Sequence, residues 1–384
     1  MRKFNGLILF TVVLCLGWTG KSALAADTIK IGCVTPLSGG YANYGINTKR
    51  GLEMALEEVN TKGGVKIQGK PYRLEVETCD DEGQSDKAVT CAMKMASMHK
   101  SPVIYTPASW SGFPLMGFNE KMNFIIMCTS QSPTFTTKGN KLVIRWVSSA
   151  NTSMPAWIKL LRKSFERNRL AIKKYGVMEA DSEVGKQWSE AFREEWTKSG
   201  GAIVGREVVN MNATDFFTNL TSLIAKNPDA IQLCSAPDEQ TAIIAEQARA
   251  LGFKGIFTTS MTCDGVKLLE MDKSKAADNS FLESTAWGVG GALFDELRKK
   301  YKEKYKEDPV FSAGLSYEGG RAIALAIEKA QSLDAVKIKE AFTSILPISN
   351  CMFCGRDMDP KTGEIFFPIY LKHVKDGKLI PIKE

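Results

Sequence analysis

Three short polar clusters in this sequence combine hydroxyl groups with other hydrogen-bonding side chains, and each directly follows an apolar run. They read ASWSG at residues 108–112, CTSQS at 128–132 and SMTCDG at 260–265. Hydroxyls and backbone N–H groups suit a carboxylate, and one carboxylate such as that of Asp264 suits an ammonium group. A single cluster of this kind is also typical of a helix N-cap. The three together predict a binding site for an amino acid.

A glycine-rich turn, PLSGGYANYG at residues 36–45, leads straight into an amphipathic stretch and offers backbone N–H groups to an anion. Its glycines are not followed by the Lys-Ser/Thr pair of a Walker loop. They also lack the G-x-G-x-x-G spacing of a dinucleotide-binding loop. A nucleotide phosphate therefore has no support here, whereas a smaller anion and a simple tight turn both stay open.

Catalytic motifs are lacking in the sequence. Its two histidines, His99 and His373, stand in neither H-E-x-x-H nor a nucleophile motif, and we expect both at the surface. The CMFC motif at residues 351–354 has redox spacing, but a turn-rich loop follows it where thioredoxin-type chemistry needs a helix. We therefore predict a protein that is not an enzyme and that needs no cofactor and no metal.

The cysteines divide into two groups. Cys79 and Cys91 flank a loop and can form a disulfide, and Cys351 and Cys354 are either a structural disulfide or unpaired thiols. The remaining ones after the first 25 residues lie in or beside apolar runs, where we expect partly buried small hydrophobic residues: Cys33, Cys128, Cys234 and Cys263.

The first 25 residues are typical of a secretory signal peptide, with Arg2 and Lys3, an apolar run and an A-x-A site ending at Ala25. We expect export to the periplasm and a mature chain that starts near Ala26. Removing this segment, which also contains Lys21, lowers the formal net charge from +7 to +4. That charge is mild and the sequence contains no dense basic run, so we expect no nucleic-acid partner.

Strand and helix patterns alternate from residue 28 onward in two successive series, as repeated βα units do. The first helix has one apolar stripe of Leu52, Ala55, Leu56 and Val59. Two βα series in a chain of 384 residues predict two similar α/β lobes, with a ligand between them at the carboxyl ends of the strands.

The C-terminal part has too few elements for a third lobe, so we expect it to dock on the other two. It contains helices predicted from Leu293 and from Tyr317. Two short strands follow, EIFFPIYL at residues 364–371 and KLIPIK at 378–383.

The opening of the chain, from IKIGCVTPLSGGYANYG to DDEGQSDKA, resembles that of the leucine/isoleucine/valine-binding proteins, the periplasmic receptors of ABC uptake systems. The shared features are Ser38-Gly39, Tyr44-Gly45, the turn GGVKIQG and the segment DDEGQSDKA. The register continues through VIYTPASWSG, CTSQSPTFTTKG, LVIRWVSS, AEQARALGFKG and SYEGGRAIALAIEKA, and so covers nearly the whole mature chain.

This resemblance implies an α/β protein with two three-layer α/β/α sandwich lobes joined by a three-strand hinge, the type I periplasmic binding protein fold. We expect a signal peptide at 1–25, lobe 1 at 26–148 plus 288–362, and lobe 2 at 149–287 plus 363–384. The family implies a monomer that traps a small molecule between its lobes and delivers it to an inner-membrane ABC permease. A ligand-sensing module of a signalling system is the alternative.

The resemblance also implies these ligand-binding residues: Tyr44, Ser109, Thr129, Ser130, Gln131, Val184 and Asp264. Trp110 is a further candidate, as a replacement for a wall of the site that the family builds from other residues. Ser109 and the 129–131 segment take the positions that bind the α-carboxylate, and Asp264 takes that of the acid that pairs with the ammonium. Gln131 stands where branched-chain receptors have threonine, and Val184 stands where they have an aromatic residue. The expected ligand is a branched-chain or other aliphatic amino acid, with a short amide or an aromatic acid as alternatives.

Overall fold

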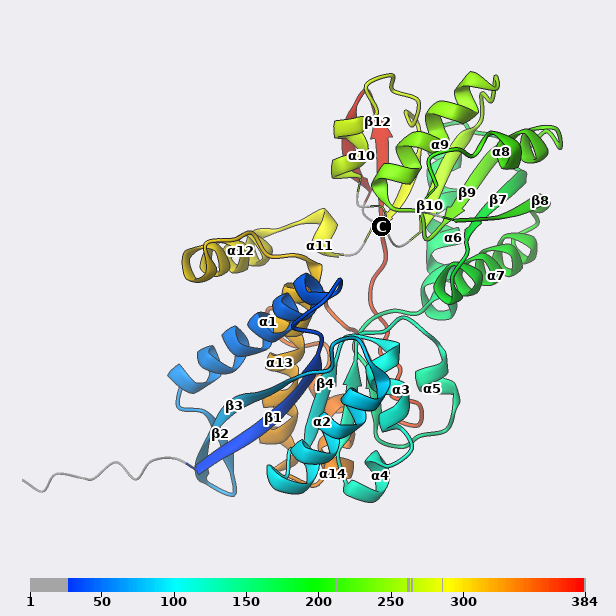
Figure 1. Cartoon of the computed structure of the whole chain (residues 1–384). Coiled ribbons are helices and arrows are strands. Elements are labelled where there is room, and N and C mark those ends of the chain that lie inside the picture. Colours follow the sequence, from blue (N-terminus) through cyan, green and yellow to red (C-terminus); the bar gives the residue numbers. More distant parts are fainter. Residues whose placement is uncertain (1–26, 211–212, 261–262, 264, 285, 383–384) are drawn as a thin grey trace, which may run out of the picture.

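The computed structural model shows a molecule of two lobes (Figure 1). It describes residues 27–382 apart from 211–212, 261–262, 264 and 285. The expected signal peptide lies outside the described residues. Among the described helices, none combines the length and the low polarity that a membrane span requires.

Lobe 1 is built on a six-stranded sheet of order β2-β3-β1-β4-β5-β6. All neighbours are parallel except β2, which forms an antiparallel hairpin with β3. β4 and β5 are buried throughout, as expected for central strands covered on both faces. The strands are β1 (Asp27–Thr35), β2 (Val65–Ile67), β3 (Lys70–Asp80), β4 (Val103–Thr106), β5 (Ile125–Cys128) and β6 (Val143–Arg145).

Helices cover both faces of this sheet. α1, α12, α13 and α14 share one apolar cluster with it, and α2, α3 and α5 share another on the opposite face. The predicted stripe of α1 is confirmed, with Leu52, Ala55 and Leu56 buried and Val59 partly buried against the same cluster. The helices are α1 (Ala42–Thr61), α2 (Ser85–Met98), α3 (Ser109–Leu115), α4 (Asn119–Met122), α5 (Thr134–Thr137), α12 (Ala292–Tyr305), α13 (Phe311–Ala330) and α14 (Ala335–Ile345).

Lobe 2 is built on a seven-stranded sheet of order β13-β12-β11-β10-β9-β7-β8. The five strands from β7 to β11 are parallel to one another, whereas β12 is antiparallel to β11 and β13 is antiparallel to β12. The strands are β7 (Lys174–Ala180), β8 (Ala202–Val209), β9 (Ala230–Cys234), β10 (Ile256–Ser260), β11 (Phe281–Ser284), β12 (Tyr370–Lys375) and β13 (Lys378–Ile382).

Helices cover both faces of this second sheet as well. α6 and α7 share an apolar cluster with one face, and α8, α9 and α10 share a cluster with the other. The helices are α6 (Ala150–Arg167), α7 (Glu183–Lys198), α8 (Phe217–Ile224), α9 (Asp238–Ala250) and α10 (Val266–Met271). The short helix α11 (Ala286–Val289) lies beside α12, and its Trp287 packs against the lobe 1 cluster (Figure 1). The predicted fold class, two three-layer α/β/α lobes, is therefore confirmed.

Three passages of the described chain connect the lobes (Figure 1). The first joins β6 to α6, the second lies between β11 and α12, and the third joins α14 to β12 through residues 364–369. The exact residue limits of each lobe stay a prediction. Each passage leaves one lobe and enters the other, so these passages are where a hinge motion would bend the chain.

Two predicted element starts are wrong. The strand expected at 364–371 is β12, which begins only at Tyr370, because residues 364–369 cross between the lobes and Pro368 has no N–H for a ladder. The helix expected from Tyr317 is α13, which begins at Phe311. Its first turn is close-packed on α1, where a methyl group at Gly51 would lie 2.2 Å from the Ala313 carbonyl oxygen. Tertiary packing therefore overrides the weak local propensity of this turn.

Both cysteine pairs form disulfides. Cys79 at the end of β3 is joined to Cys91 in α2, and Cys351 is joined to Cys354. The other cysteines of the described chain, Cys33, Cys128, Cys234 and Cys263, are free and buried. The two pairings confirm the possibilities read from the spacing, and for Cys351 and Cys354 they decide between a disulfide and free thiols.

The expectation that His373 lies at the surface is wrong, because its side chain is only 5% exposed. β12 is an inner strand, paired on one side with β11 and on the other with β13. His373 stands opposite Phe281 in this ladder and stacks on its ring, with 4.4 Å between the ring centroids. An alternating pattern read from sequence cannot tell an inner strand from an edge strand, which is why the burial was missed.

Burial, helped by Lys375, lowers the pKa of His373, while Asp278 raises it. The unfolded chain therefore takes up a proton at a higher pH than the folded chain does, so this residue costs stability as the pH falls below about 6.5. We expect His373→Phe to gain stability relative to the wild type as the pH drops from about 7 to about 5. Urea unfolding midpoints of both proteins across this range measure the gain, and parallel curves would contradict it.

Candidate ligand-binding site

Two of the predicted polar clusters meet at one edge of the lobe 1 sheet. β4 and β5 are parallel neighbours with Thr106 paired to Cys128, so the chain segments after them leave the sheet side by side. Ser109, the first residue of α3, and Ser130, two residues beyond β5, have hydroxyl oxygens 2.6 Å apart. The carboxyl ends of β4 and β5 thus bring together hydroxyls from the ASWSG and CTSQS clusters.

Tyrosine hydroxyls complete this group. The side chains of Tyr44, in the first turn of α1, and of Tyr105, in β4, both lie near the hydroxyl of Thr129, and the buried Tyr105 hydroxyl has no hydrogen-bond partner in the described part of the chain. Burial raises the pKa of both tyrosines, and the contact with Thr129 only partly offsets it. Both phenols therefore keep their protons at neutral pH and can donate hydrogen bonds to an acceptor.

Trp110 and Gln131 have polar atoms that are buried and find no hydrogen-bond partner in the described part of the chain. These atoms are the Trp110 ring N–H and the Gln131 side-chain oxygen. The Trp110 ring packs on the Tyr41 ring, with centroids 4.9 Å apart. The backbone carbonyl of Trp110 accepts a hydrogen bond from the Ser85 hydroxyl at 2.9 Å. Because buried polar groups are seldom left unpaired, a ligand is the natural partner for this donor and this acceptor.

Val184 lies in lobe 2, at the second position of α7, half-buried against the apolar cluster under α6 and α7. α7 begins with a cap, since the Ser182 hydroxyl accepts a hydrogen bond from the Gly185 N–H at 3.0 Å. The Ser132 hydroxyl of lobe 1 donates to the Glu183 carboxylate at 3.5 Å. This contact places the start of α7, and with it Val184, next to the segment after β5.

Asp264 lies outside the described residues, but the chain on both sides of it is held in lobe 2. Asp238, in the first turn of α9, accepts hydrogen bonds from the N–H groups of Gly265 and Lys267, at 3.1 and 3.0 Å. Cys263 is buried. Gly265 and Lys267, which follow Asp264 in the chain, are thus bonded to the start of α9.

The thiols near the site are poor nucleophiles. Burial raises the pKa of Cys128, which directly precedes Thr129, to about 12, and burial raises that of Cys263 well above its usual value. A thiol must lose its proton to attack, so both are unreactive at neutral pH. The disulfide-closed loop of Cys351–Cys354 has a structural role, because N–H groups of this loop donate hydrogen bonds to the buried carboxylate of Glu318.

Sequence reasoning missed Tyr105, Arg145 and Glu364. Tyr105 was read only as part of an apolar strand, and nothing local distinguishes it. Arg145 had a visible signal, since it is a charged residue inside the apolar run LVIRWV. Its side chain is 1% exposed and pairs with Glu364, which is 5% exposed. A charge in a buried strand requires a partner, and the partner here is distant in the sequence.

Comparison with known proteins gives a consistent result. The sequence model of the periplasmic binding protein family matches residues 28–378. A Leu/Ile/Val/Thr-binding protein of Salmonella typhimurium is 26% identical over 244 residues, and the chain spans only 64% of the length of that relative. A leucine-, isoleucine-, valine-, threonine-, and alanine-binding protein of Pseudomonas aeruginosa is 24% identical, and the alignment covers 98% of this chain and 97% of that protein.

A solved structure shows the same fold. It is the branched-chain amino acid transporter substrate binding protein LivJ of Streptococcus pneumoniae in complex with isoleucine, with a TM-score of 0.69 and 23% identity. The superposition covers 93% of this chain and 100% of that chain. The family resemblance read from the sequence is confirmed by these matches, and the relatives are named as binding proteins of transport systems. With its two α/β/α lobes and a family match over nearly all of its described residues, the chain belongs to the periplasmic binding protein family.

Proposed function

We propose that this protein is the exported ligand-binding component of an ABC uptake system and that it binds a small aliphatic amino acid between its lobes. The observation that carries the proposal is the hydroxyl group cluster at the carboxyl ends of β4 and β5, where Ser109, Ser130, Thr129 and Tyr44 come together. Hydroxyl and phenol donors suit the α-carboxylate of an amino acid. The names of the relatives support an amino acid as the ligand.

In this proposal the protein works as a periplasmic monomer. The α-carboxylate binds to lobe 1 first, since the hydroxyl cluster belongs to that lobe. Lobe 2 then closes over the ligand, with Val184 against the side chain and Asp264 against the ammonium group. A ligand shared between two lobes favours the closed form by its extra contacts there. The closed protein is the form that an inner-membrane ABC permease would receive.

A second ligand class is favoured by Trp110, Gln131 and Tyr41. The unpartnered Trp110 N–H and Gln131 oxygen offer one donor and one acceptor, which is the pattern that a primary amide satisfies. The packed rings of Tyr41 and Trp110, tilted by 39° to one another, also offer aromatic contacts to an aromatic acid. A short amide and an aromatic acid are therefore the alternatives to test beside aliphatic amino acids.

We expect calorimetry to show binding of at least one of leucine, isoleucine, valine and alanine, and weaker binding of acetamide and benzoate. Thr129→Val keeps the shape of the side chain but removes the hydroxyl. Losing a hydrogen bond to a charged carboxylate costs about 1.5–3 kcal/mol, which is roughly a 10- to 100-fold weaker affinity. Thr137→Val is the matched control, because Thr137 is exposed on α5 and its hydroxyl donates to the Pro133 carbonyl, away from the hydroxyl cluster.

The same ligand should reduce the radius of gyration in small-angle X-ray scattering, because closing the lobes makes the molecule more compact. A bound ligand with an unchanged radius would count against closure. Tight binding of an amide or an aromatic acid, with no binding of any amino acid, would replace the ligand class while leaving the receptor assignment in place.

A further inference from the structure

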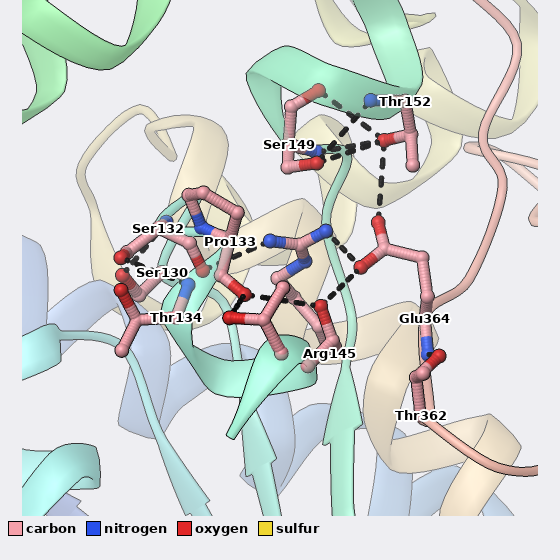
Figure 2. A network of polar contacts seen from close by, with 11 residues as sticks. Ser130, Ser132, Pro133, Thr134, Arg145, Ser149, Thr152, Thr362 and Glu364 are labelled. Carbon is pink, nitrogen blue, oxygen red and sulfur yellow. Dashed lines mark hydrogen bonds and ion pairs between the residues drawn. The ribbon is translucent and has the colours of Figure 1, made fainter. Parts of the chain in front are cut away.

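The two lobes share a buried ion pair that none of the ligand contacts uses. Arg145 is the last residue of β6, at the start of the first passage between the lobes, and Glu364 opens the third passage. Their side chains form an ion pair, shown in Figure 2, and are 1% and 5% exposed. The backbones also meet, since the Arg145 N–H donates to the Gly363 carbonyl at 2.9 Å.

Arg145 also holds the chain that follows β5. Its guanidinium donates a hydrogen bond to the Ser132 carbonyl at 2.9 Å, inside what we call the serine segment, residues 130–134 (Figure 2). Within this segment the Ser132 N–H donates to the Ser130 hydroxyl at 3.3 Å, and the Thr134 N–H donates to the Ser132 hydroxyl at 3.4 Å. The arginine thus fixes the middle of the segment whose first two residues belong to the candidate ligand site.

Glu364 links the two lobes. Its carboxylate accepts a hydrogen bond from Thr136 of α5 in lobe 1, at 2.8 Å, and one from Thr152 of α6 in lobe 2, at 3.2 Å. Thr152 also forms the capping box of α6 with Ser149 (Figure 2). A change in the angle between α5 and α6 therefore acts on the carboxylate of Glu364, and through the ion pair on Arg145 and the serine segment.

Stability alone does not explain such a pair. Removing two charges from water is costly, and replacing a buried pair with apolar residues of similar volume is often neutral or stabilising. What the pair supplies is geometry, since the planar guanidinium can bind the Ser132 carbonyl and the Glu364 carboxylate at fixed angles at once. This points to a role in positioning rather than in holding lobe 1 together.

We propose that Arg145 and Glu364 are positioning residues that set the shape of the serine segment and couple it to the hinge between the lobes. The inference rests on the proposed function in so far as the serine segment binds the ligand. It extends that function, because it couples two events. Closing the lobes strengthens the binding of the ligand to lobe 1, and ligand binding in turn favours the closed form.

The test uses the full mature chain and two readouts, one without ligand and one with leucine as the probe. The variants are the double variant Arg145→Met with Glu364→Met, and Arg145→Lys, which keeps the charge but loses the planar fork. Amide hydrogen exchange of the ligand-free protein reports on the serine segment. We expect exchange at residues 130–134 to become at least about tenfold faster in both variants, and leucine affinity to fall by about the same factor.

Stability to urea distinguishes a positioning role of the ion pair from a general role in holding the fold. The double variant leaves no uncompensated charge, so it should be more stable to urea than Glu364→Gln alone, and yet keep the fast exchange and the weak binding. Glu318→Gln is the matched control, since Glu318 is a buried glutamate of α13 whose partners are N–H groups of residues 352–354. We expect it to lower stability without changing exchange in the serine segment.

Wild-type exchange rates in the serine segment of both the double variant and Arg145→Lys would overturn the inference. So would a Glu318→Gln protein in which that segment exchanges as fast as in the double variant, because the effect would then be general. If the wild type binds none of leucine, isoleucine, valine and alanine, the proposed ligand fails, and the exchange rates of the ligand-free protein still decide the inference.

Discussion

Replacing Asp264 with alanine is expected to weaken binding of the amino-acid ligand by roughly a hundredfold or more. In the proposed binding mode this carboxylate pairs with the ligand's ammonium group, and Gly265, the next residue, is bonded to Asp238 in lobe 2. Breaking one side of a desolvated charge pair costs about 3–5 kcal/mol, because the other charge is left without a partner. Calorimetry of both proteins against the best ligand measures the loss.

Stability should change little in this variant, because the carboxylate would bind the ligand rather than lobe 2. Glu270→Ala is the control, since Glu270 is an exposed residue of α10 in the same part of lobe 2. If the best ligand is an acid without an amine and Asp264→Ala binds it as tightly as the wild type does, the amino-acid assignment is wrong and the receptor assignment stands.

The second large effect is expected from Gly45→Ala, which should destabilise lobe 1 by about 3 kcal/mol. A methyl group at this position would lie 1.7 Å from the Pro36 carbonyl oxygen and 2.7 Å from the Thr35 hydroxyl. α1 cannot move away, because it packs closely on α13 at Gly51. The glycine also follows Tyr44, so any shift that relieves the clash would displace that hydroxyl from Thr129.

Gly40→Ala is the matched control from the same glycine-rich turn. A methyl group there would meet no described atom within 4 Å, so we expect an unfolding midpoint close to that of the wild type. Urea unfolding followed by tryptophan fluorescence compares the three proteins. Equal midpoints for Gly45→Ala and Gly40→Ala would show that the turn relaxes freely, and would also remove the reason to expect weaker ligand binding in Gly45→Ala.

Local patterns were sufficient for most of the fold. The stripe of Leu52, Ala55 and Leu56 predicted the buried face of α1, because a helix repeats every 3.6 residues whatever its surroundings. The placement of Ser109 and Ser130 after apolar strands predicted that they meet, because neighbouring parallel strands end at the same edge of a sheet. The glycine-rich turn at 36–45 is now seen to need Gly45 for close packing on Pro36.

Where the predictions failed, the missing information was the neighbour in space. His373 looked like a surface residue because its own strand does not reveal that a second strand covers its other edge. The start of α13 at Phe311 depends on α1, which precedes it by some 250 residues in the sequence. The crossing segment at 364–369 looked like a strand because strand-forming residues are also used where a chain passes between lobes.

The sequence by itself therefore determined the two-lobed α/β class, the family, the disulfide candidates and the edge of the sheet where the hydroxyls of the candidate site gather. These properties depend on periodicity, spacing and the order of motifs, all of which are local. Only the tertiary structure decided that Arg145 meets Glu364 and that the pair lies between the serine segment and α6. A buried charge must find its partner wherever the fold brings one, and the 218 residues between these two carry no local sign of that contact.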